Sequence, residues 1–458
     1  MSILVPQIPH IALAERLLDQ LKQCRGASRY WVAYSGGLDS HVLLHVLSQF
    51  QYQLIPSRVH AAYINHGLNP QADAWARHCG EICAQLKVPF QTIDVDATPL
   101  PGESPEAKAR QARYSALKRL VREGDCLLTA HHKDDQLETL LLQLMRGSGP
   151  KGLAAMPVVA NFGGGEHLRP LLTCTREEIH AYAYHHQLKW IEDDSNQNAQ
   201  FDRNFLRHDI IPRLKLRWPS LLQTANRTAA LCAEASELLE HEAARDIRRL
   251  TTQGSDALDV AGLCQLSAPQ MRNVLRHWIH ARGFLLPSKA QLNSVVINVI
   301  KATNDAVPLV AWKGCEVRRY RNMLHIMPPL HEHNKAQVIA WNASDVLVID
   351  GVGTITVQQM PGQGIASKYV AKNKLTIRFR QGGEKIKPVG ADHHRSLKKL
   401  LQEHGVPPWL RERIPLLYVN DQLAAVGQMA VDDRFKTNAA EQGILINWQP
   451  AECCAPLS

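Results

Sequence analysis

The first 217 residues alternate short apolar runs, rich in β-branched and aromatic residues, with longer segments of helical periodicity. This alternation predicts strands joined by helices. The expected strands cover residues 31–34, 58–64, 90–95 and 125–130. The expected helices cover residues 41–50, 73–86, 104–123 and 135–145, and a capping-box spacing at Thr175 and Glu178 adds a helix through His186. The predicted fold class is therefore α/β, with a doubly wound, mostly parallel sheet.

The rest of the chain is expected to form a helical linker and two smaller domains. A pattern of Ala, Leu and Glu after Pro219 runs to about residue 250 and predicts a long connecting helix. Two more helical patterns in residues 267–301 are broken near Gly283 and Pro287, and residues 308–327 have β character. A second β-rich section begins near Val338. The predicted domains are residues 1–217, 218–340 (mainly helical) and 341–458 (β-rich).

The net charge of +9 is concentrated in one stretch of the chain. Between Lys368 and Arg413 there are twelve basic and four acidic residues, a local net charge of +8, whereas the remaining residues together carry +1. A single basic module in an almost neutral chain indicates a surface that binds a polyanion. Charge by itself leaves open the alternative of a solvated face of lysines and arginines.

The composition excludes several classes of protein. Hydrophobic residues make up 45% and charged residues 21%, values of a globular protein that can bury real cores. No run of 18 apolar residues occurs, which excludes a transmembrane helix. The first residues lack the basic start of a signal peptide, so we do not expect secretion. The ten cysteines lack the spacing of a disulfide-rich domain, so we expect reduced thiols and a cytoplasmic protein.

The strongest local motif is Ser35-Gly36-Gly37-Leu38-Asp39-Ser40, between a predicted strand and a predicted helix. Adjacent glycines let the backbone approach a ligand closely and direct N–H groups toward it, and the N-terminus of the next helix favours an anion. The motif therefore predicts a phosphate-binding loop. It is not a Walker A loop, because GxxxxGK[ST] is absent from the sequence. The competing interpretation is a turn in which Asp39 or Ser40 caps the helix.

Two other polar segments follow predicted strands, and so fall where a doubly wound sheet places its active site. Residues 65–68 read Asn-His-Gly-Leu, and residues 130–139 read Ala-His-His-Lys-Asp-Asp-Gln-Leu-Glu-Thr. In the second segment Asp135 and Glu138 are three apart on a first helical turn, where paired carboxylates could bind Mg²⁺ or accept a proton from an amine. They could equally form a helix capping box.

A zinc site built from His131, His132 and Asp134 is a weaker interpretation of the same segment. No companion ligand spacing of the kind that zinc sites show accompanies these residues in the sequence.

Four segments in order resemble one family of proteins. The loop 35–40 is similar to the pyrophosphate-binding loop of the N-type ATP pyrophosphatases, or PP-loop superfamily. Within it, residues 130–149 closely resemble the HHxDDQxET segment of tRNA(Ile)-lysidine synthases, and residues 194–207 resemble that family's DxSN…RNxxR segment. Ala112-Arg113-Tyr114 matches a further family position. The resemblance spans residues 20–217 and about 370–430. It departs at Ala130 and Leu137, where the family often has Gly and Ala.

The resemblance implies an adenine nucleotide alpha hydrolase-like fold and an ATP-dependent carbon–nitrogen ligase. Such an enzyme attaches L-lysine to carbon 2 of the wobble cytidine of a CAU-anticodon tRNA(Ile). The carbonyl oxygen at this carbon is a poor leaving group, so it is first adenylated with release of pyrophosphate. The lysine ε-amine then displaces AMP, and the resulting lysidine changes codon specificity from AUG to AUA. The implied partners are ATP, Mg²⁺, lysine and the tRNA, with no membrane and no obligate protein partner.

The same resemblance implies roles for individual residues. The pyrophosphate-binding residues are Ser35, Gly36, Gly37, Leu38, Asp39 and Ser40, with Asp39 also assisting Mg²⁺. Asp135 and Glu138 are expected to orient or deprotonate the lysine amine. Arg113, Arg203 and Arg207 are expected to offset phosphate charge. Arg203 and Arg207 are four apart on a predicted helix, so both could face one anion, although a solvated basic face is the alternative.

Two other functions fit parts of the pattern. A tRNA thiolase of this superfamily would be expected to carry CxxC pairs, whereas Cys79 and Cys83 are spaced CxxxC and Cys453 and Cys454 are adjacent. Cys79 and Cys83 are therefore expected in the core. A non-catalytic tRNA-binding protein would share the basic module, but it would not release pyrophosphate in a manner that depends on lysine and tRNA.

The basic module has its own pattern. Residues 374–388 alternate apolar and basic positions, as in a strand with one cationic face, and Gly382-Gly383 indicates a turn. Residues 396–401 predict a helix. The module resembles the family's C-terminal domain, which is implied to hold the tRNA acceptor stem, and distributed basic residues suit A-form RNA. The candidate tRNA-binding residues are Arg378, Arg380, Lys398, Lys399, Arg411 and Arg413.

Overall fold

The computed structural model describes residues 9–24, 26–54, 57–67, 69–99, 105–192, 201–252, 255–303, 306–344 and 346–451. The predictions on Leu68, on the Asp194-Ser195-Asn196 motif and on the Cys453-Cys454 pair fall outside these residues. The chain divides into two compact units, Met1–Leu238 and Leu239–Ser458. No helix in the described part of the chain is long and apolar enough to cross a membrane.

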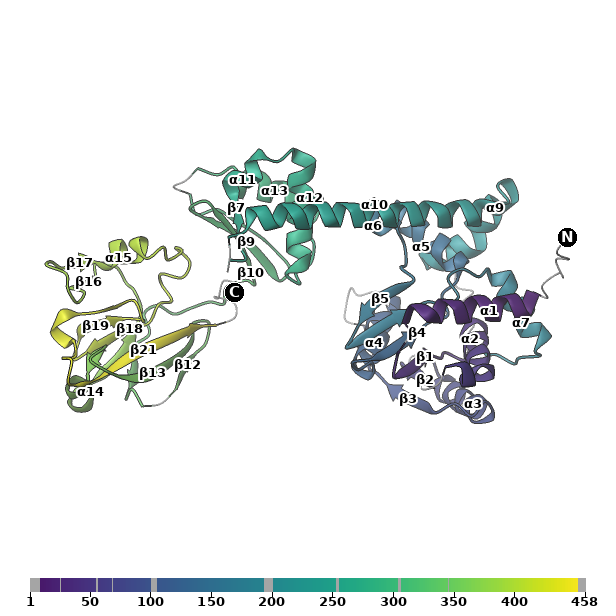
Figure 1. The fold of residues 1–458 in the computed structure, drawn as a ribbon, viewed down its shortest axis with the longest axis horizontal. Helices are drawn as coiled ribbons and strands as arrows, with labels where there is room; N and C mark the ends of the chain where they lie inside the picture. The colour runs from purple at the N-terminus through teal and green to yellow at the C-terminus, as the bar shows by residue number, and fades with distance from the viewer. Residues whose placement is uncertain are drawn as a thin grey trace. The chain divides into compact units, whose positions relative to one another are not determined.

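The first unit contains a six-stranded sheet in the order β3-β2-β1-β4-β6-β5 (Figure 1). Its strands are β1 (Arg29–Ala33), β2 (Arg58–Asn65), β3 (Phe90–Asp94), β4 (Asp125–Leu128), β5 (Val159–Phe162) and β6 (Gly165–Leu168). Every neighbouring pair is parallel except the β5–β6 hairpin. The predicted α/β fold with a mostly parallel sheet is confirmed. The hairpin was not predicted, because its strands are short and turn at Gly163-Gly164.

Helices cover both faces of this sheet because its strands are apolar on both sides. The helices of the unit are α1 (Pro9–Leu21), α2 (Leu38–Gln49), α3 (Ala72–Gln85), α4 (Pro105–Leu120), α5 (Lys133–Met145), α6 (Pro150–Leu153), α7 (Arg176–His185), α8 (Asp202–Phe205) and α9 (Ile211–Arg217). On β1, Tyr30 and Val32 pack in a core with α1, α2, α3 and α7. Trp31, on the opposite face, packs against Leu117 of α4. The alternation follows from the period of two in a strand.

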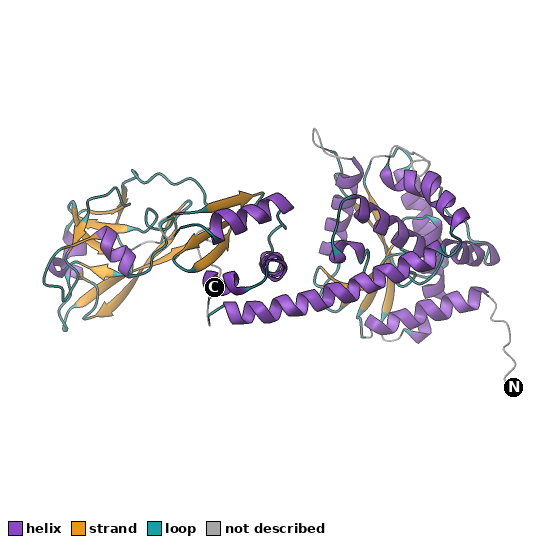
Figure 2. Ribbon diagram, turned by 90° about the horizontal axis from the view of Figure 1, so that it is seen from above, coloured by secondary structure: helices purple, strands orange, loops and turns teal. Residues whose placement is uncertain are grey.

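The second unit has a mixed α/β part and a β-rich part (Figure 2). Helix α10 (Leu221–Leu250) begins in the first unit and ends in the second. It is followed by α11 (Val260–Gln265), α12 (Ala268–Ala281) and α13 (Lys289–Ser294), and α13 continues as a π-helix over Val295–Ile300. These accompany a sheet in the order β7-β10-β9-β8, formed by Leu258–Asp259, Met323–Met327, Cys315–Tyr320 and Leu309–Trp312. The predicted break between the helices lies at Gly283, where φ is +78°.

The β-rich part contains the basic module. One sheet has the order β11-β15-β18-β19-β20, formed by Ile339–Trp341, Leu375–Arg378, Leu416–Val419, Gln422–Val426 and Ala430–Val431. A second has the order β12-β13-β21-β14, formed by Leu347–Ile349, Gly353–Pro361, Gln442–Pro450 and Ile365–Ala366. The short pair β16 (Lys385–Ile386) and β17 (Arg395–Ser396) precedes α15 (Leu397–Glu403), and α14 (Ser367–Lys372) follows β14. The strand pattern predicted over residues 374–388 forms only the short strands β15 and β16, and three of the four residues of β15 are buried. The predicted helix is α15.

Candidate active site

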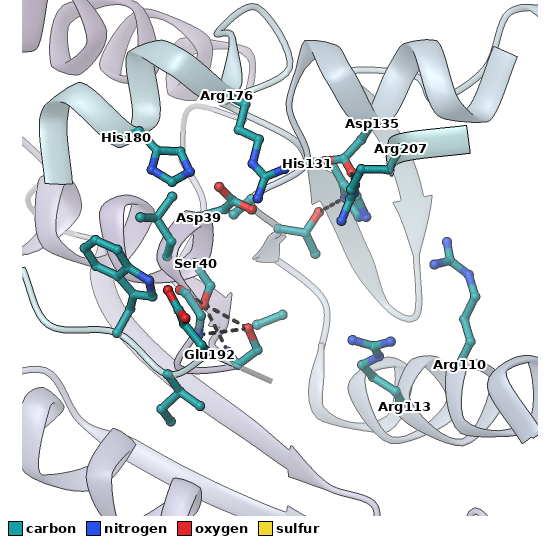
Figure 3. A pocket seen from close by; sticks show the side chains of 18 of the residues that line it. Asp39, Ser40, Arg110, Arg113, His131, Asp135, Arg176, His180, Glu192 and Arg207 are labelled. Atoms are coloured by element: carbon teal, nitrogen blue, oxygen red, sulfur yellow. Dashed lines mark hydrogen bonds and ion pairs between the residues drawn. The ribbon is translucent and has the colours of Figure 1, made fainter. Parts of the chain in front are cut away.

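A cavity of about 480 Å³ lies in the first unit, at the carboxyl ends of β1 and β4. These neighbouring strands are where the connections of the sheet diverge, since β2 follows on one side of β1 and β4 lies on the other. Such a switch point is the expected ligand position in an open α/β sheet. Its walls come from the loops after β1 and β4 and from α4 and α7, including Asp39, His131, Arg113 and Arg176 (Figure 3).

The loop between β1 and α2 forms one wall. Gly36 has φ of +79°, and a Cβ there would lie 2.5 Å from Ile191 Cδ1 and 2.9 Å from Cys79 Sγ. The loop is fixed from within, because the Ser40 hydroxyl accepts from Ser35 N at 3.2 Å and donates to Gly37 O at 3.0 Å. The N-cap of α2 is Gly37, which has no side-chain oxygen to occupy the first N–H groups of the helix. This arrangement leaves a helix N-terminus suited to an anion.

The loop after β4 forms the opposite wall, and it corrects the predicted capping box. The N-cap of α5 is His132, and the Asp135 carboxylate accepts from the His132 backbone N–H at 3.0 Å. A box with Asp135 as N-cap and Glu138 as its partner is therefore wrong, because the helix begins at Lys133, two residues before the predicted start. Asp134 accepts from Lys215 Nζ at 2.7 Å and from Arg176 N at 3.0 Å, so it ties α5 to α9 and α7.

The structure brings Asp135, Glu138, Arg203 and Arg207 into one ion-pair cluster. Glu138 is 1% exposed and accepts from Arg203 Nε at 2.7 Å and from Arg207 Nε at 2.6 Å. Asp135 Oδ1 lies 3.2 Å from the terminal nitrogen of Arg207 and 3.7 Å from that of Arg203. Asp135 and Arg207 line the cavity (Figure 3), whereas Glu138 and Arg203 are not among its lining residues. The two arginines do face one anion, and that anion is Glu138.

His132 is buried among three carboxylates, an environment that the sequence did not reveal. Its Nε2 lies 3.6 Å from Asp39 and 3.4 Å from Asp135, and its Nδ1 lies 3.7 Å from Asp134. Burial disfavours the imidazolium, but the carboxylates outweigh burial and raise the pKa of His132 above its ordinary value. For Asp39, burial is likewise outweighed by His132 and by nearby arginines, so the pKa of Asp39 is lowered. His132 thus links the loop after β1 to the loop after β4.

Asp39 offers an oxygen that could hold a metal ion. Its Oδ1 is buried and has no hydrogen-bond partner among the described residues. One or two carboxylates completed by substrate phosphates are the usual Mg²⁺ ligands in nucleotide sites. Asp39 fits that pattern. The described residues contain no group of three or more His, Cys, Asp or Glu side chains placed to hold a metal by themselves.

Helix α4 supplies the positive side of the cavity. Arg110 and Arg113 reach from this helix toward it (Figure 3). Arg110 lies over the ring of Tyr114, with its guanidinium carbon 4.9 Å from the ring centre. Burial, followed by the charge of Arg113, lowers the pKa of His66, from the loop after β2. His66 therefore lies near Arg113, although residues 65–67 are not among those that line the cavity.

Several lining residues were not predicted as part of the site. They are Arg110, Thr129, Arg176, His180, Trp190, Ile191, Glu192 and His208. Trp190–Glu192 are separated from the motif at residues 194–196 by one residue in the sequence, and the backbone N–H of Ile191 donates to Gly36 O at 2.9 Å. Their proximity to that motif was the available signal. Arg176 and His180 lie on α7, one turn apart, and only the tertiary structure places them here.

Models of three protein domains match parts of the chain. Residues 10–214 match the PP-loop domain, residues 258–325 the TilS substrate binding domain, and residues 375–448 the TilS substrate C-terminal domain. The chain is 42% identical to the tRNA(Ile)-lysidine synthase of Coxiella burnetii over 95% of this chain and 96% of that protein. It is 40% identical to that of Methylococcus capsulatus, over 92% and 97%. The chain belongs to the tRNA(Ile)-lysidine synthase family. A further member, from Pectobacterium atrosepticum, is 43% identical over 90% and 93%.

The six residues predicted to bind tRNA differ in exposure. Lys398 and Lys399 are exposed on the first turn of α15, where Ser396 caps the helix by accepting from Lys399 N at 3.4 Å. Arg378 lies over the ring of Tyr418 at 4.5 Å and pairs with Asp421. Arg380 is half-buried.

The last two candidates, Arg411 and Arg413, serve internal contacts. Arg413 is 9% exposed and donates to the carbonyls of Gly351 and His331 at 3.2 and 2.7 Å. Arg411 donates to Val406 O at 2.8 Å and to the Tyr320 hydroxyl at 3.2 Å. Lys398 and Lys399 are therefore the candidates most open to a phosphate.

Proposed function

We propose that this chain joins L-lysine to carbon 2 of the wobble cytidine of tRNA(Ile). Its relatives are named tRNA(Ile)-lysidine synthases, which supports the formation of lysidine on this tRNA. The cytidine carbonyl oxygen forms a bond to the α-phosphorus of ATP, and pyrophosphate leaves. The lysine ε-amine then forms a bond to carbon 2, AMP leaves with the former carbonyl oxygen, and the amine gives up a proton. The product is lysidine, and the enzyme is an ATP-dependent ligase.

One observation carries the proposal. The loop after β1, the Asp135 segment and the α4 arginines surround a single cavity, although they lie far apart in the sequence. A phosphate-binding loop, a carboxylate and guanidinium groups in one space are what adenylation followed by amine attack requires.

Each group has a task in this reaction. The N–H groups at the start of α2 hold the leaving pyrophosphate, and Mg²⁺ on Asp39 would neutralise phosphate charge when bound. Arg113 and Arg207 stabilise the negative charge that develops on the phosphates. Asp135 orients the lysine amine and accepts the proton that the amine gives up. Glu138 fixes Arg203 and Arg207, because it accepts from both guanidinium groups and does not itself line the cavity.

The remaining parts of the chain are proposed to bind the substrate tRNA. Residues 1–217 would form the catalytic domain, 218–340 the connection and middle domain, and 341–458 the basic tRNA-binding domain. The tRNA substrate favours the cytoplasm as the place of reaction. The thiolase alternative lacks support at Cys79 and Cys83, because both are fully buried and burial raises the pKa of each thiol to about 12.

Pyrophosphate release tests the proposal. The intact protein is incubated with ATP, Mg²⁺, lysine and CAU-anticodon tRNA(Ile), and each component is omitted in turn. We expect complete turnover only with all four, and incorporation of labelled lysine in equal amount to the pyrophosphate released. Pyrophosphate release that does not depend on tRNA, or lysine that does not enter tRNA, would overturn the proposal.

A further inference from the structure

A chain of buried polar side chains runs from the interior of the first unit to the cavity. The terminal nitrogen of Arg169 lies 3.2 Å from His167 Nδ1. His167 Nε2 lies 2.8 Å from the Thr129 hydroxyl, and the same hydroxyl lies 2.8 Å from His131 Nδ1. Thr129, His167 and Arg169 are 7%, 2% and 9% exposed. His131, the last member, lines the cavity (Figure 3).

The guanidinium of Arg169 fixes the position of every proton along this series of hydrogen-bonded side chains. A guanidinium only donates, so His167 Nδ1 must accept and its proton must lie on Nε2. Nε2–H then donates to Thr129, whose single hydroxyl hydrogen is left to donate to His131 Nδ1. His131 therefore accepts at Nδ1 and carries its proton on Nε2. Among the described residues no side chain accepts from that nitrogen, which leaves it as a donor for a ligand.

The surroundings keep both rings neutral. Burial, reinforced by the charges of Arg169 and of the other nearby basic groups, lowers the pKa of His131 to about 3. Burial and the same Arg169 lower the pKa of His167 to about 3. The groups that act on His131 are Arg169, Arg203, Arg110 and His132, all of them basic. At neutral pH this relay of Arg169, His167, Thr129 and His131 thus contains one permanent charge, on Arg169, and two neutral imidazoles.

Arg169 holds its charge at a cost to stability. Its described hydrogen-bond partners are the Pro157 carbonyl, at 2.7 Å, and His167, and neither is a carboxylate. Burial lowers the pKa of Arg169. A buried cation without a counter-ion destabilises a fold more than an apolar residue of similar size would. An arginine at this position has a reason: it determines which ring nitrogen of His167, and through Thr129 which ring nitrogen of His131, carries the proton.

We propose that Arg169, His167 and Thr129 are positioning residues that hold His131 as a neutral imidazole whose Nε2–H donates to an acceptor oxygen or nitrogen of the bound nucleotide or nucleobase. The fixed tautomer is a property of the protein itself, whereas the acceptor rests on the proposed function. Fixing the donor in advance spares the site the cost of selecting a tautomer when the substrate binds.

Nitrogen NMR of the intact, ligand-free protein with ¹⁵N-labelled histidine tests the tautomer. The His131 signals are assigned by their loss in His131→Gln. We expect Nδ1 in the range of an unprotonated imidazole nitrogen and Nε2 in the range of a protonated one, both unchanged from pH 6 to pH 8. A proton on Nδ1, or on both nitrogens, overturns the proposal. This result does not depend on which reaction the enzyme catalyses, so a failure of the proposed function is detected separately by the pyrophosphate assay.

Thr129→Val and Thr129→Ser form a matched pair, because only the serine keeps the hydroxyl that connects the two rings. We expect Thr129→Val to give a mixture of His131 tautomers. We also expect kcat/KM to fall about tenfold, which corresponds to the free energy of one hydrogen bond. Thr129→Ser should retain the tautomer and stay within about twofold of the unsubstituted enzyme. Arg169→Met, read by NMR, provides a second break in the relay if Thr129→Val folds poorly. Retention of a single Nε2–H tautomer in both Thr129→Val and Arg169→Met overturns the proposal.

Discussion

The loop at residues 35–40 contains two adjacent glycines that should respond differently to the same substitution. Gly36→Ala places a methyl group 2.5 Å from Ile191 Cδ1 and 2.9 Å from Cys79 Sγ, on a backbone with φ of +79°. The positive φ costs about 1–2 kcal/mol and the overlap about 1–3 kcal/mol, so we expect a loss of roughly 2–5 kcal/mol. Gly37→Ala is the control: φ is −74°, and the new Cβ would lie 3.5 Å from Ser35 Oγ, an ordinary contact.

Calorimetry of the intact protein measures the difference. In a unit of this size, 2–5 kcal/mol corresponds to a fall of roughly 5–15 °C in the midpoint of the unfolding transition of the first unit. Gly37→Ala should shift that midpoint by less than about 2 °C. Ile191→Val removes the atom nearest to the new methyl group, so Gly36→Ala should cost about 1 kcal/mol less in that background. Equal, small shifts for Gly36→Ala and Gly37→Ala would show that the loop yields freely and that the close approach to Ile191 is not a constraint.

Three further predictions concern charge. Glu138→Gln removes the carboxylate that Arg203 and Arg207 share as their acceptor. Lysine incorporation should fall at least a hundredfold, and calorimetry should show a destabilisation of about 3 kcal/mol. Near-full turnover would reduce Glu138 to a structural residue. Lys398→Ala with Lys399→Ala should weaken tRNA binding and reduce the slope of log K against log salt by about 1–2, with ATP binding unchanged; an equal loss of ATP binding would refute the division of labour. Burial, followed by His186 and His41, lowers the pKa of His45 to about 4. As the pH falls, His45 is protonated in the unfolded chain before it is protonated in the folded one, so the free energy of unfolding falls from about pH 6.5 toward pH 4. Between pH 7 and pH 5, the unfolding midpoint of His45→Gln should fall by a few degrees less than that of the unsubstituted protein. An identical fall in the two proteins would contradict this prediction.

The helices and strands around the phosphate loop follow from local patterns. β1, β2, β3 and β4 lie within about two residues of their predicted bounds, since buried parallel strands give short continuous apolar runs. The capping box of Thr175 and Glu178 is confirmed, with Glu178 N donating to Thr175 Oγ1 at 3.2 Å. The start of α5 was misplaced because His132 is an unusual N-cap, and only the bond from its N–H to Asp135 identifies it.

The site was less predictable than the fold. The motifs identified the family, and the family is confirmed by relatives that match nearly the whole chain. The roles of the individual residues stay predictions, as does the three-domain division. The pairing of Glu138 with two arginines could not be read from the motifs, because a motif records residue types and not which of them neutralise one another. Arg413 belongs to the same basic module as Lys398, yet it is buried and bonded to carbonyls.

The sequence by itself determined the α/β fold, the PP-loop domain and the family, because these depend on periodicity and on residues close together in the chain. The tertiary structure decided which distant groups meet: Ile191 on Gly36, Arg203 and Arg207 on Glu138, and Arg169 linked to His131 through two intervening side chains. The physical reason is that charge, tautomer and pKa depend on burial and on neighbours within a few ångströms, and those neighbours are set by packing across the sheet.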